Sequence, residues 1–536
     1  MNSEKVRAGR RREDIAYHYS SFVFGFSLFI FHFSLWCFLI VLFDSPLPAA
    51  DPGDAAQAAR RHVRSKQHEI VNELVTFLAI PNVSDDLPNI RKNARHLKEL
   101  LEKRGIQGQI LEMDIAPLVY GELNTPGASE TVLFYCHYDG DPVDPSRWTV
   151  NQPFQPALLD RSLAEGGQPI PFPESGTSYQ EDWRIYARSS SDDKSPIIAL
   201  LVALDALRAA RIEPTVNVKF LFEGEEEAGS PHLAEFLQKY RNLLEADLAV
   251  FADGPVFPTG DPTVYFGVRG IVSLALTLYG PIRPLHSGHY GNWAPNPAML
   301  LSRLLSSMKG EDGRVLVDGF YDDVQPLSDL EKEALRQAPH IEEWLKTELG
   351  LAWSEVEGMR ISEAVNLPSL NIQGLQSGWV GEQARSIIPS EATAHIDLRL
   401  VQGIEPQRQV QRVIDHIRRQ GFHVVEDVPD QETRREHKKI ARVVANKGYP
   451  ALRTPMDLPV SSRVVRAVET AAGSVVKLPT MGGSVPLYLF PEHLGTPVIG
   501  LPTVNPDNNQ HSPNENLRLG HFFRAIEIFA AVMAMQ

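Results

Sequence analysis

Histidine and acidic residues form several short motifs in this 536-residue chain. The first contains His137 and Asp139, which follow the apolar run 131–135 and precede a chain break at Gly140 and Pro142. An imidazole with a carboxylate two residues away suits a metal ligand whose second ring nitrogen must be held in place. A polar pair that only hydrogen-bonds at a strand end has the same pattern. This motif alone therefore leaves both interpretations open.

Two acidic runs follow further along the chain. Asp192 and Asp193 precede an apolar helical pattern that starts near Pro196, where carboxylates also commonly cap a helix. The run 225–227 comes directly after the strand-like segment 215–222. Three adjacent carboxylates beside a core are costly unless a cation neutralises them. A solvated acidic loop is the common alternative for such a run.

Three more candidates stand at the ends of segments. Asp253 follows the buried-strand pattern 246–252, His286 begins a His-Ser-Gly motif, and His511 begins a His-x-Pro-Asn-Glu motif. Taken singly, a loop histidine such as His511 is ordinary. Because the carboxyl ends of parallel strands meet at one edge of a sheet, the repetition of such side chains predicts a shared site.

The elements that must position these residues alternate between strands and helices, which is typical of an α/β fold. Longer alternating strands at 270–278 and 391–400, with an amphipathic helix at 406–420, indicate a separate α+β unit inserted into the first. We expect an irregular Pro-rich loop over 141–182 and a charged helical stretch over 311–349.

Composition limits the class of protein. The chain is 43% hydrophobic and 22% charged, as globular proteins are, and its net charge of −15 argues against a nucleic-acid partner. Only two cysteines occur, Cys37 and Cys136, which excludes a disulfide framework and a thiolate metal cluster. Any metal must therefore be held by His, Asp and Glu.

Residues 1–50 have the pattern of a signal peptide or a membrane anchor. Basic residues precede the stretch 22–43, which carries no formal charge, and the Ala49-Ala50 pair resembles a cleavage site. The stretch is also long enough to span a bilayer. In either case the basic side stays in the cytoplasm, so we expect an exported protein, periplasmic or extracellular.

The ordered motifs together resemble the dinuclear zinc metallopeptidase family of carnosine dipeptidases, aminoacylases, glutamate carboxypeptidases and succinyl-diaminopimelate desuccinylase, nearest the dipeptidase branch. The motifs that carry the resemblance are His-x-Asp at 137, Ser-Asp-Asp-Lys at 191, Glu-Gly-x-Glu-Glu-x-Gly-Ser at 223, His-Ser-Gly at 286 and His-x-Pro-Asn-Glu at 511. The resemblance implies a catalytic domain with a mixed, mostly parallel sheet, built from 55–266 and 426–536. A smaller lid or dimerisation domain, 267–425, would be inserted in it.

The resemblance also implies the roles of individual residues. The ligands of two zinc ions, or of manganese or cobalt, would be His137, Asp192, Glu227, Asp253 and His511, with Asp192 bridging. Glu226 would be general base and acid, and Asp139 would orient His137. His286 would stabilise the oxyanion and can come from a second subunit, so we expect a homodimer. The substrate carboxylate would be bound by Arg399, Gly482, Gly483 and Ser484.

We therefore predict a zinc-dependent exopeptidase of the dipeptidase or carboxypeptidase type, in which Glu226 activates a metal-bridging water to cleave small peptides with a free carboxylate. An amidase or deacylase of N-acyl amino acids is the alternative, and a non-catalytic exported metal-binding protein is a remote one. Two features depart from the family pattern. Ala187, Ser189 and Ser195 stand where the family usually has glycine, and Glu225 adds a negative charge expected to alter metal affinity.

Overall fold

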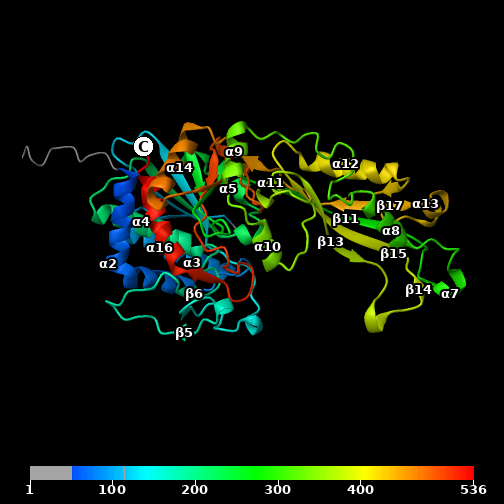
Figure 1. Ribbon diagram of the computed structural model, residues 1–536, viewed down its shortest axis with the longest axis horizontal. Helices are drawn as coiled ribbons and strands as arrows, with labels where there is room; N and C mark the ends of the chain where they lie inside the picture. The colour runs from blue at the N-terminus through cyan, green and yellow to red at the C-terminus, as the bar shows by residue number, and fades with distance from the viewer. Residues whose placement is uncertain (1–50, 114) are drawn as a thin grey trace, which may run out of the picture. The chain divides into compact units, whose positions relative to one another are not determined.

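A computed structural model describes residues 51–113 and 115–536 (Figure 1). The segment predicted to be a signal peptide or membrane anchor, 1–50, lies outside the described residues. Within the described ranges, no helix combines the length and the apolar character needed to cross a membrane.

The larger sheet has eight strands in the order β1-β2-β7-β3-β8-β20-β9-β19. Four neighbouring strands at its centre run parallel: β7 (Asn217–Glu223), β3 (Thr131–His137), β8 (Leu248–Phe251) and β20 (Val498–Gly500). The outer strands are β1 (Gln109–Leu111), β2 (Leu118–Leu123), β9 (Thr263–Tyr265) and β19 (Val476–Leu478). Antiparallel pairs join β1 to β2, β2 to β7 and β20 to β9, so the predicted mixed, mostly parallel sheet is confirmed.

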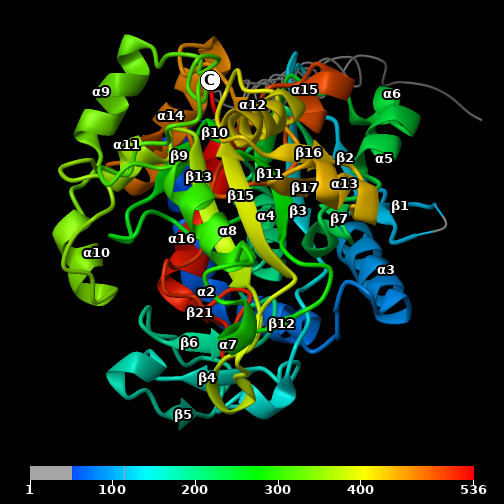
Figure 2. The same ribbon diagram turned by 90° about the vertical axis from the view of Figure 1, so that its right-hand side faces the viewer.

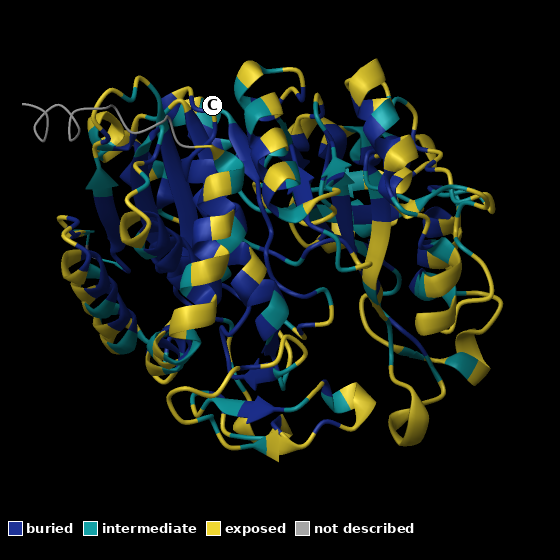
Figure 3. Ribbon diagram, turned by 60° about the vertical axis from the view of Figure 1, so that its left-hand side comes forward, coloured by how far each residue is buried: buried dark blue, intermediate teal, exposed yellow. Residues whose placement is uncertain are grey.

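Helices cover both faces of this sheet, as parallel strands require. In β3, Val132, Phe134 and Cys136 face one core, while Leu133 and Tyr135 face another. The first core is closed by α2 (Pro52–Leu78), α3 (Leu87–Lys103), α4 (Lys194–Ala209), α14 (Pro459–Ala472) and α16 (Leu519–Met533). The second is closed by α5 (Leu233–Lys239), α6 (Arg241–Leu244) and α15 (Leu489–Leu494). Figure 3 shows buried strands between helices that expose only one side.

The second sheet has five strands in the order β13-β15-β11-β17-β16. They are β13 (Ser369–Gln376), β15 (Glu391–Leu400), β11 (Gly270–Tyr279), β17 (Ile440–Ala445) and β16 (His423–Val425). Its buried face packs against α8 (Pro297–Ser306) and α12 (Pro406–Arg419), which gives the predicted α+β unit its own core (Figures 1 and 2). The expected domain division at 425/426 falls between β16 and β17, so the chain leaves this sheet only after Ala445.

Short elements connect the two sheets and extend the second one. β10 (Gly267–Val268) pairs with β18 (Leu452–Arg453) where the chain passes between the sheets. At the other end of the five-stranded sheet, β12 (Leu285–His286) pairs with β14 (Ile387–Ile388). The remaining short helices are α7 (Ser287–Tyr290), α11 (Ile361–Ala364) and α13 (Gln431–Glu436).

Two segments differ from the sequence-based expectation. The expected loop 141–182 contains β4 (Ala157–Leu159) and β5 (Pro169–Ile170), which join β6 (Arg184–Tyr186) and β21 (Asn516–Arg518) in a four-stranded sheet. Strands of two or three residues are too short to show alternation in the sequence. The expected helical stretch 311–349 is helical only in α9 (Asp329–Gln337) and α10 (Glu342–Glu348). Its first part turns at Gly313 and Gly319, whose φ angles of 77° and 74° do not fit a helix.

Candidate metal centre

The candidate ligands gather at the carboxyl-terminal edge of the eight-stranded sheet. His137 ends β3, the turn 226–228 follows β7, and Asp253 follows β8. Potential ligand atoms lie within 4.8 Å of one another in two groups, which share His137. One group is His137, Asp192 and Glu227, and the other is His137, Asp193 and Asp253. Together with His511, these residues form what we call the His–carboxylate cluster.

Asp192 lies between two imidazoles in this cluster. Its Oδ1 is 2.9 Å from His137 Nε2, and its Oδ2 is 3.0 Å from His511 Nε2. His511 Nε2 is also 3.3 Å from Glu227 Oε2. The structure therefore brings together all five predicted ligands, because Asp253 joins them through its group with His137.

The capping alternative for the Asp192–Asp193 pair is wrong. Asp193 is the residue before α4, but its side chain makes no capping hydrogen bond to that helix. Its Oδ2 instead accepts the backbone N–H of His137 at 3.2 Å. Its Oδ1 is buried without a hydrogen-bond partner among the described residues. Asp193 was not among the predicted ligands and belongs to the second group.

The charge of the cluster fits a divalent cation. Burial raises the pKa of Glu227 to about 8 and that of Asp253 to about 6, and it raises the pKa of Glu226 well above its ordinary value. Such shifts mean that the ionised carboxylates lack a neutralising charge. Imidazole and carboxylate donors suit zinc, and also manganese or cobalt. The residues present therefore fit a metal centre.

Asp139 holds both the imidazole and the acidic turn. Its buried carboxylate Oδ1 is 3.3 Å from His137 Nδ1. The same carboxylate accepts the backbone N–H groups of Glu226 at 3.1 Å and Glu227 at 3.0 Å. Asp139 belongs to neither ligand group, so its contacts match the predicted orienting residue, although that role stays a prediction.

The predicted carboxylate-binding residues lie where the chain passes between the two sheets. Arg399, at the end of β15, donates from Nη1 to Ser484 Oγ at 2.7 Å. Tyr449 donates its hydroxyl to the Ser484 carbonyl at 2.8 Å. Burial, and then the charge of Glu226, raises the pKa of Tyr449 to about 12. Arg399 and Tyr449 thus both contact Ser484, and Tyr449 lies near enough to Glu226 for its charge to act on the phenol.

Comparison with known proteins decides the family. Residues 133–535 match the family described as Peptidase family M20/M25/M40. The chain belongs to peptidase family M20/M25/M40. The family expected from the five motifs is thus confirmed, and the chain is a metal-dependent peptide-bond hydrolase.

Relatives of this M20 peptidase cover most of its length. The Cys-Gly metallodipeptidase DUG1 of Candida albicans is 26% identical over 85% of this chain and 92% of its own. The human Beta-Ala-His dipeptidase is 24% identical over 91% of this chain and 94% of its own. The M20 family metallo-carboxypeptidase Sso-CP2 from Sulfolobus solfataricus is 29% identical, with a TM-score of 0.69 over 87% of this chain and 99% of that one. Human carnosine dipeptidase 1 has the same fold, at 23% identity and a TM-score of 0.68 over 91% and 99%.

His286 of the M20 peptidase is not brought to the cluster. It lies exposed in β12, beside β14, where its Nδ1 accepts the N–H of Gly288 at 3.1 Å. No contact between described residues joins it to the His–carboxylate cluster. Arg399 is eight positions along β15 from Glu391, the end near β14, which corresponds to about 26 Å of strand. Figure 1 shows α7 and β14 together at that distant end.

The departures from the family pattern are absorbed locally. Glu225 is buried and accepts the backbone N–H of His232 at 2.9 Å, with the ring Nδ1 at 3.0 Å. Its carboxylate therefore belongs to neither ligand group. Ser189 adopts a left-handed conformation, with φ of 59°, and its hydroxyl accepts a hydrogen bond from Asn82 at 2.9 Å. The Ser195 hydroxyl is buried without a partner among the described residues.

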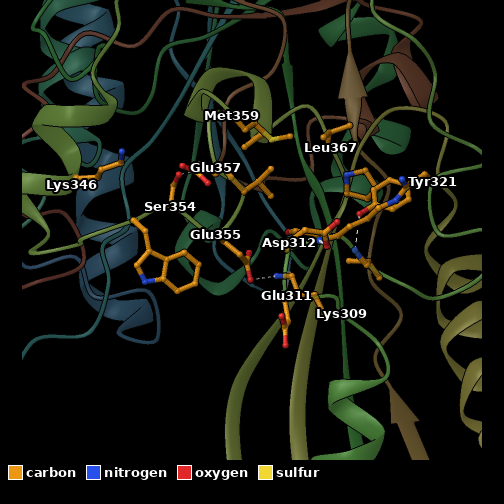
Figure 4. A pocket seen from close by; sticks show the side chains of 18 of the residues that line it. Lys309, Glu311, Asp312, Tyr321, Lys346, Ser354, Glu355, Glu357, Met359 and Leu367 are labelled. Carbon is orange, nitrogen blue, oxygen red and sulfur yellow. Dashed lines mark hydrogen bonds and ion pairs between the residues drawn. The ribbon is translucent and has the colours of Figure 1, made fainter.

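A cavity of about 850 Å³ lies elsewhere in the peptidase, between the segments 309–321 and 352–369 (Figure 4). Both of its lysines pair with glutamates. Lys309 lies 2.5 Å from Glu355, and Lys346 lies 2.8 Å from Glu343. Neither group of potential metal ligands found among the described residues lies in it.

Residues that hold the cluster in place were missed by the sequence analysis. Glu515 is buried and accepts the backbone N–H groups of Ser189, Ser191 and Asp192, and it pairs with Arg188. The sequence did offer one signal for Glu515. It is the last residue of the His-x-Pro-Asn-Glu motif, and the resemblance assigned a role only to the histidine of that motif.

Proposed function

We propose that the protein is a zinc-dependent dipeptidase that hydrolyses small peptides with a free carboxylate. One observation carries the proposal: Glu226 lies beside the His–carboxylate cluster, with its Oε2 4.0 Å from His137 Nε2, but belongs to neither ligand group. Arg399 is half-buried and donates to Asp397 Oδ2 at 3.1 Å and to the Ser484 hydroxyl at 2.7 Å, and an arginine beside a hydroxyl suits recognition of a carboxylate. The relatives named as dipeptidases support the dipeptidase type.

His137 and Asp253 would hold one cation, Glu227 and His511 the other, and Asp192 would contact both. Asp193 adds an acceptor on the side of Asp253. Zinc is our proposal, with manganese and cobalt as alternatives. When bound, two such cations acidify a water molecule and polarise the scissile carbonyl.

Glu226 performs the proton transfers in this proposal. Its Oε2 is 4.0 Å from His137 Nε2, and it belongs to neither ligand group, so its carboxylate can face the reacting water. It would take a proton from that water and give it to the leaving amine nitrogen. Asp139 fixes its backbone N–H, which keeps the carboxylate at the edge of the cluster.

The subunit arrangement follows from the position of His286. Since about 26 Å of β15 separates it from Arg399, it would stabilise the oxyanion of a partner subunit. The edge strand β13 supports a homodimer, because Ile372 and Leu375 are 39% and 61% exposed there. Export, with cleavage or anchoring at 1–50, stays part of the proposal and depends only on the sequence pattern.

A substrate panel tests the function. The purified protein is stripped with a chelator, reloaded with zinc, manganese or cobalt, and assayed on dipeptides, on the same dipeptides with an amidated C-terminus, and on N-acetyl and N-succinyl amino acids. We expect metal-dependent hydrolysis of the dipeptides and a large loss on amidation, because amidation removes the charge that Arg399 binds. Cleavage of N-acyl amino acids alone would make the protein a deacylase, and no metal-dependent cleavage would overturn the proposal.

A further inference from the structure

Two loops carry the ligands that meet at one end of the cluster. The first, residues 187–193, contains Asp192, and we call it the Asp192 loop. The second, residues 505–515, contains His511, and we call it the His511 loop. The contact of 3.0 Å between Asp192 Oδ2 and His511 Nε2 depends on how these loops are held together.

The carboxylate of Glu515 lies in the Asp192 loop, although Glu515 belongs to the His511 loop. Its Oε2 accepts hydrogen bonds from the backbone nitrogen of Ser189 at 2.9 Å and from Arg188 Nη1 at 3.0 Å. Its Oε1 accepts the N–H groups of Ser191 at 2.9 Å and Asp192 at 3.0 Å. Glu515 is fully buried, so these four donors replace all of its contact with water.

Those bonds determine the conformation of the Asp192 loop. Three backbone N–H groups of a buried loop need acceptors, and leaving them unpaired would cost far more than an ordinary hydrogen bond contributes. The single carboxylate satisfies all three. Ser189, with φ of 59°, turns the chain so that its N–H and that of Ser191 point at the same side chain.

Further contacts fix the register between the loops. The N–H of Ala187 donates to the Glu515 carbonyl at 3.1 Å, and β6 pairs with β21 directly beyond. The Ser191 hydroxyl donates to the Asn516 carbonyl at 2.8 Å. Arg188 and Glu515 are both buried, and the guanidinium carbon of Arg188 lies 5.9 Å from the centre of the Trp148 ring. The position of Asp192 is thus set by a residue only four positions beyond His511.

We infer that Glu515 is a positioning residue that joins the two ligand-bearing loops and thereby sets the affinity of the cation held by Asp192, Glu227 and His511. This inference rests on the proposed metal centre. Glu515 touches no reacting atom. It acts through the backbone of Asp192, as partners of metal ligands commonly do.

The test is zinc titration of the chelator-stripped protein carrying Glu515→Gln. The amide keeps the size of the side chain but replaces one acceptor oxygen with an NH2 donor. That donor would face backbone N–H groups, which are also donors. We expect wild type to bind two zinc ions and the variant to bind the second about 10- to 100-fold more weakly. Hydrogen exchange at the amides of Ser189, Ser191 and Asp192 should become faster in the same variant.

A matched control comes from Glu331 in α9. It is 5% exposed, its Oε1 lies 3.1 Å from Arg453 Nε, and its Oε2 accepts the N–H of Ser328 at 2.6 Å. Glu331→Gln therefore also breaks a buried glutamate–arginine pair, but outside the cluster. It should lower the thermal midpoint and leave both zinc affinities unchanged.

A milder variant keeps the test possible if the Glu515→Gln protein does not fold. Arg188→Lys keeps the three backbone bonds of Glu515 and weakens only its ion pair, so the second zinc affinity should fall by a smaller factor. Unchanged zinc binding in a folded Glu515 variant, or an equal loss in Glu331→Gln, would overturn the inference. Failure of wild type itself to bind two zinc ions would instead overturn the proposed function.

Discussion

The two sheets of this peptidase distribute their functional residues in opposite ways. The eight-stranded sheet brings His137, the turn 226–228 and Asp253 to one edge. The five-stranded sheet places Arg399 near one end of β15, and the other end of that strand, about 26 Å away, leads to β14 and its partner His286. The first sheet thus assembles the His–carboxylate cluster within one chain, whereas the second carries Arg399 and His286 toward opposite ends.

Strand direction explains the difference. β7, β3 and β8 are parallel, so all their carboxyl ends lie on the same side. β11 and β15 are antiparallel over ten paired residues, from Gly270 opposite Leu400 to Tyr279 opposite Glu391. Residues that follow one strand therefore lie beside the start of the other. Such a unit can serve two sites, its own through Arg399 and a partner's through His286.

The largest effect is expected inside the eight-stranded sheet, from Glu226→Gln. The amide keeps the shape of Glu226 but cannot take the proton of the reacting water, so kcat should fall by about 10²- to 10⁴-fold. Zinc content, measured by mass spectrometry of the purified variant, should stay at two ions per chain, because Glu226 lies outside both ligand groups.

The adjacent residue supplies the control for this prediction. Glu225→Gln changes a buried glutamate whose carboxylate contacts His232 at 2.9 Å and not the cluster. Its kcat should stay within a few-fold of wild type. A Glu226→Gln variant with wild-type turnover would show that a group other than Glu226 transfers the proton.

The next effect tests the five-stranded sheet by mixing inactive chains. If His286 acts on the partner, a Glu226→Gln chain and a His286→Ala chain together form dimers with one complete site. Random exchange at equal amounts gives mixed dimers half the time, so activity should rise to about a quarter of wild type. The measurement is turnover after dissociation and reassociation of the two purified variants.

The reverse mixture distinguishes the two arrangements. A chain carrying both substitutions, mixed with wild type, should inactivate the wild-type site of each mixed dimer when His286 acts across the interface. When His286 acts within its own chain, that site keeps full activity. If the first mixture recovers no activity although mass measurement shows that subunits have exchanged, His286 does not act on the partner subunit. Arg399 and His286 would then serve the same subunit.

The sequence predicted the parts of the molecule that have a regular pattern. The apolar run before His137 and the long alternation of 270–278 and 391–400 follow strand periodicity, so β3, β11 and β15 could be located. The polar residues at the ends of parallel strands could then be assigned to one edge. The short strands β4 and β5 could not be located, since two or three residues carry no period.

The supports of the site were harder to predict for a different reason. Glu515 satisfies backbone N–H groups more than 320 positions away in the sequence, and such a bond leaves no periodic signal. The alternative for Asp193, helix capping, was reasonable from its position but wrong, because its carboxylate turns to the N–H of His137. The separation of His286 from the His–carboxylate cluster of the same chain was also not predictable, because it depends on the lengths and pairing of the strands, which only the structure gives.

The smallest effect compares one buried histidine from each core under acid. Burial, and then Arg518 and Arg524, lowers the pKa of His521 in α16 to about 4, and its Nε2 has no hydrogen-bond partner among the described residues. His416 in α12 also has a lowered pKa through burial, but its Nε2 lies 2.9 Å from the Ser307 hydroxyl.

Because the unfolded chain takes up a proton near pH 6.5 while folded His521 stays neutral, its contribution is complete above pH 6.5 and is lost as pH falls to about 4. The loss is at most about 3 kcal/mol in the free energy of unfolding. Hydrogen exchange of α16 should therefore accelerate over this window, and more than that of α12. His521→Gln should flatten the response of α16 and leave α12 unchanged. An equal response of both helices to His521→Gln would mean that the two cores open together and that the sheets are not separate units of stability.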